Sequence, residues 1–322
     1  MTNPLTNQPT NREDKTEAES QKTPDFSKFN VNDSYQIPVR NNGNAENGAE
    51  KKRLSRGRLE EIDYSLSNRD REVLLTVQTY RYLMSGQIRR LLFTDATTPS
   101  AALRAANRNL KKLKNLGLIN SLSRRIGGVR AGSSSLVWYI THAGERLLGL
   151  HNDTPCPAKC FFQPSPYFLA HTLAVAETAI RFIEISRTNN IQLSSIQMEP
   201  ECWREYSDCG TAIPLKPDLY ASVISGEYED RYFLEIDLDT ESISKVLEKC
   251  GRYHKYYRSG LEQEETGIFP LTVWIVPDVK RKQKIIENIK TAFDKQPRLF
   301  AVIVANELEY LIRDGGDSSM LC

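Results

Sequence analysis

The sequence predicts a mixed α and β protein with two folded segments, and two observations support this prediction. The chain has 322 residues, of which 39% are hydrophobic, so it is long enough for about two domains with hydrophobic cores. From about residue 61 onward, apolar side chains recur at helical or strand spacing, whereas the first 60 residues contain few of them. We therefore predict a disordered tail over 1–60, domains over 61–150 and 161–312, and a loose tail over 313–322.

The N-terminal tail ends in a cluster of basic side chains, directly before the first predicted domain. The cluster comprises Lys51, Lys52, Arg53, Arg56 and Arg58. One interpretation is a solvated tail, and the other is a basic arm that contacts DNA phosphates. Both interpretations stay open at the level of the sequence.

Three helices are predicted at the start of the first domain. Ser67 or Asn68 caps a helix that extends to Tyr80, and a second, shorter helix starts at Ser85. A polar stretch with Pro99 then marks a turn before the third helix. The apolar side chains expected on one face of this third helix are Leu103, Ala106, Leu110, Leu113 and Leu116.

A β-hairpin follows the third helix. Two short β-like stretches, 118–122 and 135–140, flank a loop that is rich in glycine and arginine. Thr141 then caps a last helix over 142–148. Three helices followed by a hairpin in this order predict a winged helix-turn-helix.

The distribution of charge in this domain predicts binding to double-stranded DNA. The whole chain has a net charge of only +2, but residues 96–144 contain no Asp or Glu and carry eight basic side chains. The third helix and the loop therefore predict a basic helix for the major groove and a wing for the DNA backbone. The candidate DNA-binding residues are Arg104, Asn107, Arg108, Lys111, Lys112, Arg124, Arg125 and Arg130. The alternative is a winged domain that contacts only proteins and has a solvated basic face.

The second predicted domain alternates strands and helices, which is typical of an α/β or α+β module. Its predicted helices span 166–187, 241–257 and 279–294. Its predicted strands span 191–198, 219–224, 232–238, 271–276 and 300–304.

Acidic residues gather on two neighbouring strands of this domain. Because side chains alternate along a strand, Glu235, Asp237 and Asp239 are expected on one face, and Asp218 opens the preceding strand. Carboxylates at this density predict a metal site formed by Asp218, Glu235 and Asp237, suited to Mg²⁺ or Mn²⁺. Lys249, on the next helix, is placed to orient water or to stabilise developing charge. The alternative is a network of ion pairs with no catalytic role.

These residues carry a family resemblance. Pro217-Asp218, Glu235-Ile236-Asp237 and Lys249 resemble the PD-(D/E)xK nucleases, which implies a restriction-endonuclease-like α/β fold. Over roughly residues 65–305 the chain resembles the replication-relaxation proteins of plasmids and mobile elements. This resemblance rests on the order of a winged helix, His171-Thr-Leu-Ala-Val-Ala, Leu-Lys-Pro-Asp218, Phe233-Leu-Glu-Ile-Asp-Leu-Asp-Thr-Glu241, Lys249 and Tyr253. Catalytic roles for Asp218, Glu235, Asp237 and Lys249 are what this resemblance implies. One departure is that Asp237 stands where the nuclease pattern has lysine.

The expected function is therefore DNA binding in plasmid or mobile-element replication or mobilisation. A Mg²⁺-dependent endonuclease or nickase activity stays open beside two alternatives, a non-enzymatic regulator and an adaptor with an inactive nuclease fold. An adaptor would recruit a relaxase or a replication initiator, and a homodimer is a further expectation. No apolar run reaches the roughly 18 residues that cross a bilayer, and the N-terminus is polar, so we expect a cytoplasmic protein without membrane contact.

Overall fold

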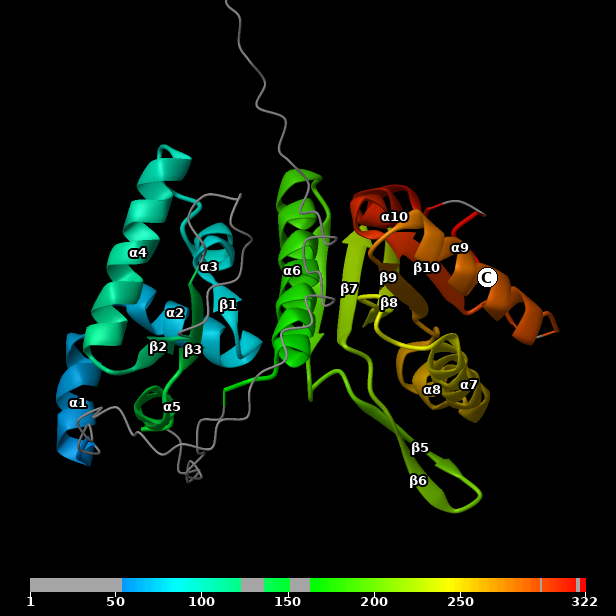
Figure 1. Ribbon diagram of the computed structural model, residues 1–322, viewed down its shortest axis with the longest axis horizontal. Coiled ribbons are helices and arrows are strands. Elements are labelled where there is room, and N and C mark those ends of the chain that lie inside the picture. The colour runs from blue at the N-terminus through cyan, green and yellow to red at the C-terminus, as the bar shows by residue number, and fades with distance from the viewer. Residues whose placement is uncertain (1–53, 123–135, 151–162, 296, 317–318) are drawn as a thin grey trace, which may run out of the picture.

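The computed structural model describes residues 54–122, 136–150, 163–295, 297–316 and 319–322, and it has a mixed α and β architecture (Figure 1). The N-terminal part contains five helices and three short strands among these residues. They are α1 (Arg56–Ser65), α2 (Asn68–Tyr80), β1 (Leu83–Met84), α3 (Ser85–Leu92), α4 (Pro99–Asn115), β2 (Ile119–Ser121), β3 (Val137–Ile140) and α5 (His142–Leu148). The strands form one antiparallel sheet in the order β1-β3-β2.

Side-chain caps define where these helices begin. The Ser67 hydroxyl accepts a hydrogen bond from the backbone of Asp70, whose carboxylate in turn accepts from the Ser67 backbone, so the pair forms a capping box for α2. Thr98 caps α4, where Pro99 takes the first helical position, and Thr141 caps α5. The predicted starts of the second and last helices at Ser85 and His142 are confirmed.

Two predictions for this part differ from the structure. Helix α1 begins inside the segment that the composition predicts as a disordered tail, and its Leu59 and Ile62 are buried. On α4, Leu103 is 41% exposed, and Ala102 takes the buried position instead. The buried residues Ala102, Ala106, Leu110 and Leu113 keep the spacing of one helical face, and Leu103 lies one residue away from that face.

The C-terminal part is built on a five-stranded sheet in the order β10-β9-β8-β7-β4. Its strands are β4 (Gln192–Met198), β7 (Leu219–Ser225), β8 (Tyr228–Ile236), β9 (Leu271–Val276) and β10 (Phe300–Val304). Strand β7 pairs antiparallel with β4 and β8, whereas β9 pairs parallel with β8 and β10. The bounds of β9 and β10 are those that the sequence predicts.

Helices cover both faces of this sheet. The long helix α6 (Pro166–Thr188) packs on one face, and α7 (Ile243–Ser259) and α9 (Val279–Ala292) pack on the other (Figure 1). The remaining elements are α8 (Leu261–Thr266), the 3₁₀ turn η2 (Ala305–Glu307), α10 (Leu308–Asp314) and the hairpin β5 (Arg204–Asp208) and β6 (Thr211–Leu215). The hairpin projects away from the sheet, and it was not predicted from the sequence.

The chain departs from the predicted pattern at the end of β8 and at the C-terminus. The strand ends at Ile236 rather than at Leu238, and Asp239 has a positive φ of 59°, so the chain turns away from the sheet here. The last residues were expected to form a loose tail, but Met320 is buried and Leu321 pairs with Ala301 beside β10. No helix among the described residues is long and apolar enough to span a membrane.

Helix α6 joins the two parts. It lies between the N-terminal helices and the sheet (Figure 1), and one contiguous cluster of buried side chains includes residues of α2 and α3, of α6 and of the sheet. Polar groups also cross this junction. Gln87 and Arg90 of α3 both hydrogen-bond the buried carboxylate of Glu177, and Arg90 forms a two-point ion pair with Glu184.

Candidate functional site

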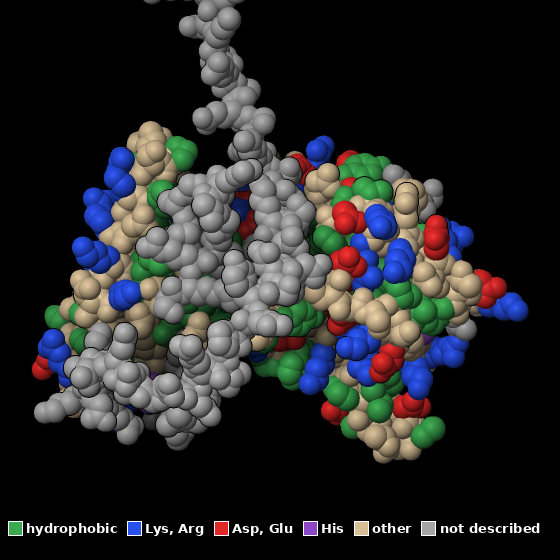
Figure 2. Space-filling model, in the orientation of Figure 1, with side chains coloured by type: hydrophobic (Ala, Val, Ile, Leu, Met, Phe, Trp, Pro, Cys, Tyr) green, Lys and Arg blue, Asp and Glu red, His purple; other side chains and the backbone are tan. Residues whose placement is uncertain are grey.

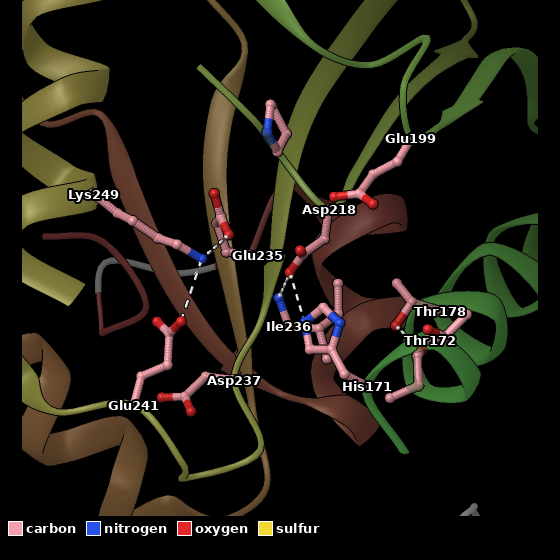
Figure 3. Close-up of polar contacts among 12 residues, drawn as sticks. His171, Thr172, Thr178, Glu199, Asp218, Glu235, Ile236, Asp237, Glu241 and Lys249 are labelled. Carbon is pink, nitrogen blue, oxygen red and sulfur yellow. Dashed lines mark hydrogen bonds and ion pairs between the residues drawn. The ribbon is translucent and has the colours of Figure 1, made fainter. Parts of the chain in front are cut away.

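Two buried carboxylates lie side by side where β7 begins and β8 ends (Figure 3). Asp218 precedes β7, and its backbone nitrogen donates to the carbonyl of Leu234 at 3.0 Å. Its side chain also accepts a hydrogen bond of 2.8 Å from the backbone of Ile236. These bonds hold Asp218 next to Glu235, which lies between Leu234 and Ile236 on β8 and is 1% exposed. The strand pairing therefore brings together two of the acids that the sequence singles out.

His171 of α6 contacts Asp218 from the helix side. Its Nε2 lies 3.2 Å from the Asp218 carboxylate. Burial alone would lower the pKa of His171, but the hydrogen bond and the charge of Asp218 outweigh burial and raise it. Burial likewise opposes ionisation of Asp218, yet His171 and Lys249 hold the pKa of Asp218 below its usual value. Each member of the pair therefore favours the charged form of the other.

The surroundings of Glu235 shift its pKa in the direction opposite to that of Asp218. Its carboxylate accepts hydrogen bonds from Lys249 Nζ at 3.0 Å and from the Tyr253 hydroxyl at 2.8 Å. Burial, followed by the negative charge of Asp218, raises the pKa of Glu235 to about 7 in spite of both donors. Two adjacent carboxyl groups with pKa values displaced in opposite directions mark a candidate site for acid–base or metal chemistry.

Lys249 reaches this pair from α7 and also lies 3.7 Å from the Glu241 carboxylate (Figure 3). Burial would lower the pKa of Lys249, but the charges of Glu235, Asp218 and Glu241 raise it above the ordinary value, so the ammonium stays charged. The sequence prediction that Lys249 reaches the acids from the following helix is therefore reproduced in the geometry.

Asp237 does not share this arrangement. Both of its oxygens are engaged, since Arg281 of α9 forms a fork with one at 2.6 and 2.7 Å and the backbone of Asp239 donates to the other at 2.7 Å. Arg281 also lies 3.2 Å from the Asp239 carboxylate. The face of three acids that alternation predicts is not formed, because β8 ends at Ile236 and the guanidinium draws the following acids toward α9.

The residues fit a divalent cation only in part. Asp218 and Glu235 carry the hard oxygen donors that Mg²⁺ prefers, but Lys249 and Tyr253 donate to the two oxygens of Glu235. The oxygens of Asp237 are likewise engaged, by Arg281 and by the backbone. Among the described residues, no group of three or more His, Cys, Asp and Glu side chains is arranged to hold a metal ion. The carboxylates that would coordinate a divalent cation are therefore those of Asp218 and Glu235.

A small cavity of about 50 Å³ opens beside Asp218 and His171. Residues of the N-terminal part, including Arg81 at the end of α2, line it together with Glu199, which follows β4. Arg81 pairs with the Glu199 carboxylate at 3.5 Å. The N-terminal part thus forms one wall of the space next to the acidic pair.

A second candidate site is the exposed face of α4. Arg104, Asn107, Arg108 and Lys111 are all exposed there. Figure 2 shows basic side chains along α4 with no acidic side chain among them. Lys112 differs from the others, since its ammonium lies 2.6 Å from the buried carboxylate of Asp70 on α2. The remaining predicted DNA-binding residues, Arg124, Arg125 and Arg130, lie outside the described residues.

Sequence reasoning missed several residues of the acidic site. The place of His171 on an apolar helix predicts a core or interface histidine, and the sequence does not single out Arg281 or Glu199. Arg281 lies 44 positions after its partner Asp237, so no local spacing connects the two. The signal for His171 was its place on an apolar helix before the strands, which does not reveal which strand the helix crosses.

The comparison with family models gives one match. The replication-relaxation family model matches residues 74–272, which include α4, the acidic pair and Lys249. No curated protein matches the chain. No solved structure matches it either. Because the matched region is more than half of the chain, the protein belongs to the replication-relaxation family, and this membership indicates a role in plasmid or mobile-element replication.

Proposed function

We propose that the protein binds double-stranded DNA during plasmid or mobile-element replication or mobilisation, through a winged helix-turn-helix over residues 61–150. The observation that carries the proposal is the exposed face of α4 with Arg104, Arg108 and Lys111, which lies in a stretch of sequence, residues 96–144, that contains no Asp or Glu. A helix with this face is suited to the major groove, where arginine reads guanine and Asn107 reads adenine. The order α2, α3, α4 and then strands β2 and β3 supports the winged architecture.

The double variant Arg104→Ala/Arg108→Ala tests this proposal. It is expected to weaken duplex binding and to flatten the dependence of log affinity on log salt by about 0.9 for each of the two side chains that contacts a phosphate rather than a base. Binding is measured by fluorescence anisotropy across a salt series. Lys280→Ala/Lys284→Ala is the matched control, because it removes the same charge from exposed positions of α9. Equal duplex affinities of the wild type, the α4 variant and the α9 control would show that α4 does not contact the DNA.

We further propose that the acidic pair belongs to a PD-(D/E)xK nuclease-like domain over 161–312 that nicks or cuts DNA. Asp218 and Glu235 would hold Mg²⁺ or Mn²⁺, and Lys249 would orient water or a phosphate oxygen beside them. A bound divalent ion supplies an activated water and stabilises the charge of the phosphodiester transition state. The protein's own contribution is to bury the two carboxylates and to keep Lys249 charged beside Glu235.

Supercoiled plasmid incubated with the protein in Mg²⁺, in Mn²⁺ and in EDTA tests the nuclease proposal. Nicking that requires metal and is lost in Glu235→Ala is the expected result. Glu287→Ala, which removes an exposed carboxylate from α9, is the matched control. Nicking that survives in Glu235→Ala would exclude this site from the chemistry.

The occupied oxygens of Asp237 favour a second candidate function, an adaptor or regulator built on an inactive nuclease fold. Such a protein binds DNA equally well in EDTA and cleaves nothing. As an adaptor it would co-purify with a relaxase or a replication initiator. As a regulator it would act through the winged helix alone, as a monomer or a homodimer.

A further inference from the structure

Exposed aromatic side chains gather around the acidic pair. Six aromatic side chains are substantially exposed among the described residues, namely Tyr64, Tyr167, Phe168, Trp203, Tyr228 and Tyr310. Two of these six, Phe168 and Tyr167, lie at the cavity beside Asp218 and at His171, and a third, Trp203, adjoins Cys202, whose thiol donates to the Pro217 carbonyl at 3.0 Å. Phe168 lines the cavity beside Asp218, and Tyr167 stacks on His171 with ring centroids 6.5 Å apart. Trp203 follows the turn after β4 that contributes Glu199 to the same cavity.

Trp203 differs from the other tryptophans of the chain. It is 38% exposed, whereas Trp138 and Trp274 are buried. The ammonium of Lys216 lies 4.0 Å from the centre of its ring, a cation–π contact that covers one face of the indole and leaves the rest of the exposed ring surface accessible. Lys216 is itself exposed and precedes Asp218 by two residues. A ring and a cation are therefore presented together at the root of the β5–β6 hairpin, next to the acidic pair.

This combination fits an unpaired nucleotide. A base stacks on an exposed aromatic ring through its π face, and its phosphate requires a nearby cation. In a duplex both faces of each base are already stacked on neighbouring bases, so only an unpaired strand offers a free face. Lys216 supplies the cation, and Phe168 and Tyr167 offer further rings at the cavity and at His171.

We propose that this aromatic rim, formed by Trp203, Phe168 and Tyr167 with Lys216, binds an unpaired stretch of DNA and leads its backbone past Asp218 and Glu235. The inference rests on the proposed function, because it names the form of DNA that reaches the acidic site. The winged helix then holds duplex DNA while the rim holds a separated strand, and the two surfaces bind independently.

Tryptophan fluorescence tests the rim directly, because Trp203 is the exposed member of the three tryptophans. Titration with a single-stranded oligothymidylate in EDTA is expected to quench the emission saturably. Trp203→Phe keeps an aromatic ring and is expected to lose the quenching while it retains most of the affinity.

Trp203→Ala and Phe168→Ala are each expected to weaken binding of a labelled oligothymidylate about tenfold, the effect of losing one stacked base. Tyr228→Ala, an exposed aromatic at the start of β8, is the matched control and should bind normally.

The α4 variant separates the two proposals. Arg104→Ala/Arg108→Ala is expected to keep its affinity for oligothymidylate and to lose duplex binding. No quenching in the wild-type protein, with duplex binding intact, would overturn the rim and leave the winged helix in place. Single-strand binding that is lost in the α4 variant and retained in Trp203→Ala would also overturn the rim. A wild-type protein that binds neither duplex DNA nor oligothymidylate would overturn both proposals.

Discussion

Glu235 is a carboxyl group whose proton affinity is changed by folding. Its pKa rises from 4.5 to about 7, because the group is buried and lies beside Asp218. Between these two values the folded chain holds a proton that the unfolded chain releases. Stability associated with this proton is fully present below pH 4.5 and is lost as the pH rises toward 7, at up to about 1.4 kcal/mol per pH unit.

Glu235→Gln removes this proton equilibrium while it keeps a side chain of similar size beside Tyr253. The free energy of unfolding of the variant is expected to gain on that of the wild type as the pH rises from 5 to 7. Urea unfolding at a series of pH values measures the difference. Glu287→Gln, an exposed carboxylate on α9, should run parallel to the wild type. A constant difference between Glu235→Gln and wild type would show that Glu235 titrates normally.

Lys112 was grouped with the DNA-binding residues on the basis of sequence, but its ammonium neutralises Asp70. The Asp70 carboxylate is buried and also accepts from Asn109 and from the cap residue Ser67. Although burial opposes ionisation, the hydrogen bonds with Lys112 and Ser67 hold the pKa of Asp70 below its usual value. Lys112→Met removes the ammonium and leaves the Asp70 carboxylate with its hydrogen bonds from Asn109 and Ser67.

We therefore expect Lys112→Met to lower the free energy of unfolding by about 1–2 kcal/mol, the cost of leaving a buried polar group partly unsatisfied. Arg104→Met, at an exposed position of the same helix, should leave stability within about 0.5 kcal/mol of wild type. Chemical denaturation measures both. Duplex affinity should show the reverse order, with the larger loss in Arg104→Met. A larger loss of stability in Arg104→Met than in Lys112→Met would mean that the ion pair between Lys112 and Asp70 contributes little to the free energy of unfolding.

Among the secondary-structure elements, helices α3 and α6 are held together by an ion pair with little access to water. Glu177 is 5% exposed and receives hydrogen bonds from Arg90 at 2.5 Å and from Gln87 at 3.1 Å. Glu184, the second partner of Arg90, has a side chain that is 37% exposed. The two glutamates thus bind the same guanidinium in different surroundings, so they form a matched pair for experiment.

Glu177→Ala is expected to destabilise the protein by about 2–3 kcal/mol, because Arg90 then keeps only Glu184 as a partner and Gln87 keeps only its 3.3 Å bond to the Leu173 carbonyl. Glu184→Ala is expected to cost only about 1 kcal/mol, because water replaces the partner there. Urea denaturation of the two variants checks the order. Equal losses would show that water reaches the buried carboxylate.

The sequence predicts a helix or strand correctly where local residue spacing determines its bounds. The prediction fails where contacts between distant parts of the chain determine where the element ends. The bounds of β9 and β10 follow from short apolar runs, and helix starts follow from caps such as Thr141. Alternation along β8 correctly placed Glu235, but the strand ends before Asp237, which pairs with Arg281 44 residues away. The β5–β6 hairpin has no alternation of apolar residues, so the sequence did not reveal it.

Across the whole molecule, α6 makes the two parts into one cooperative structure. Ala174, Ala176 and Ile180 belong to a single buried cluster that extends from Val77 on α2 to Ile303 on β10. Separating the N-terminal part would expose this face of α6 and the Glu177 network together. The apolar burial across α6 therefore couples the stability of both parts.

This coupling predicts one thermal transition rather than two. In differential scanning calorimetry the wild-type protein should unfold in a single endotherm, because neither part keeps its core when the other unfolds. Arg90→Ala combined with Glu177→Ala removes the charged contacts of the junction without leaving a lone charge from this pair. If the ion pair supplies much of the coupling, the endotherm of this double variant should broaden or split while the fold of each part persists. Two resolved endotherms in the wild type would instead mean that α6 packs firmly on the sheet alone, so that the N-terminal part with its basic helix unfolds independently of the sheet that carries the acidic pair.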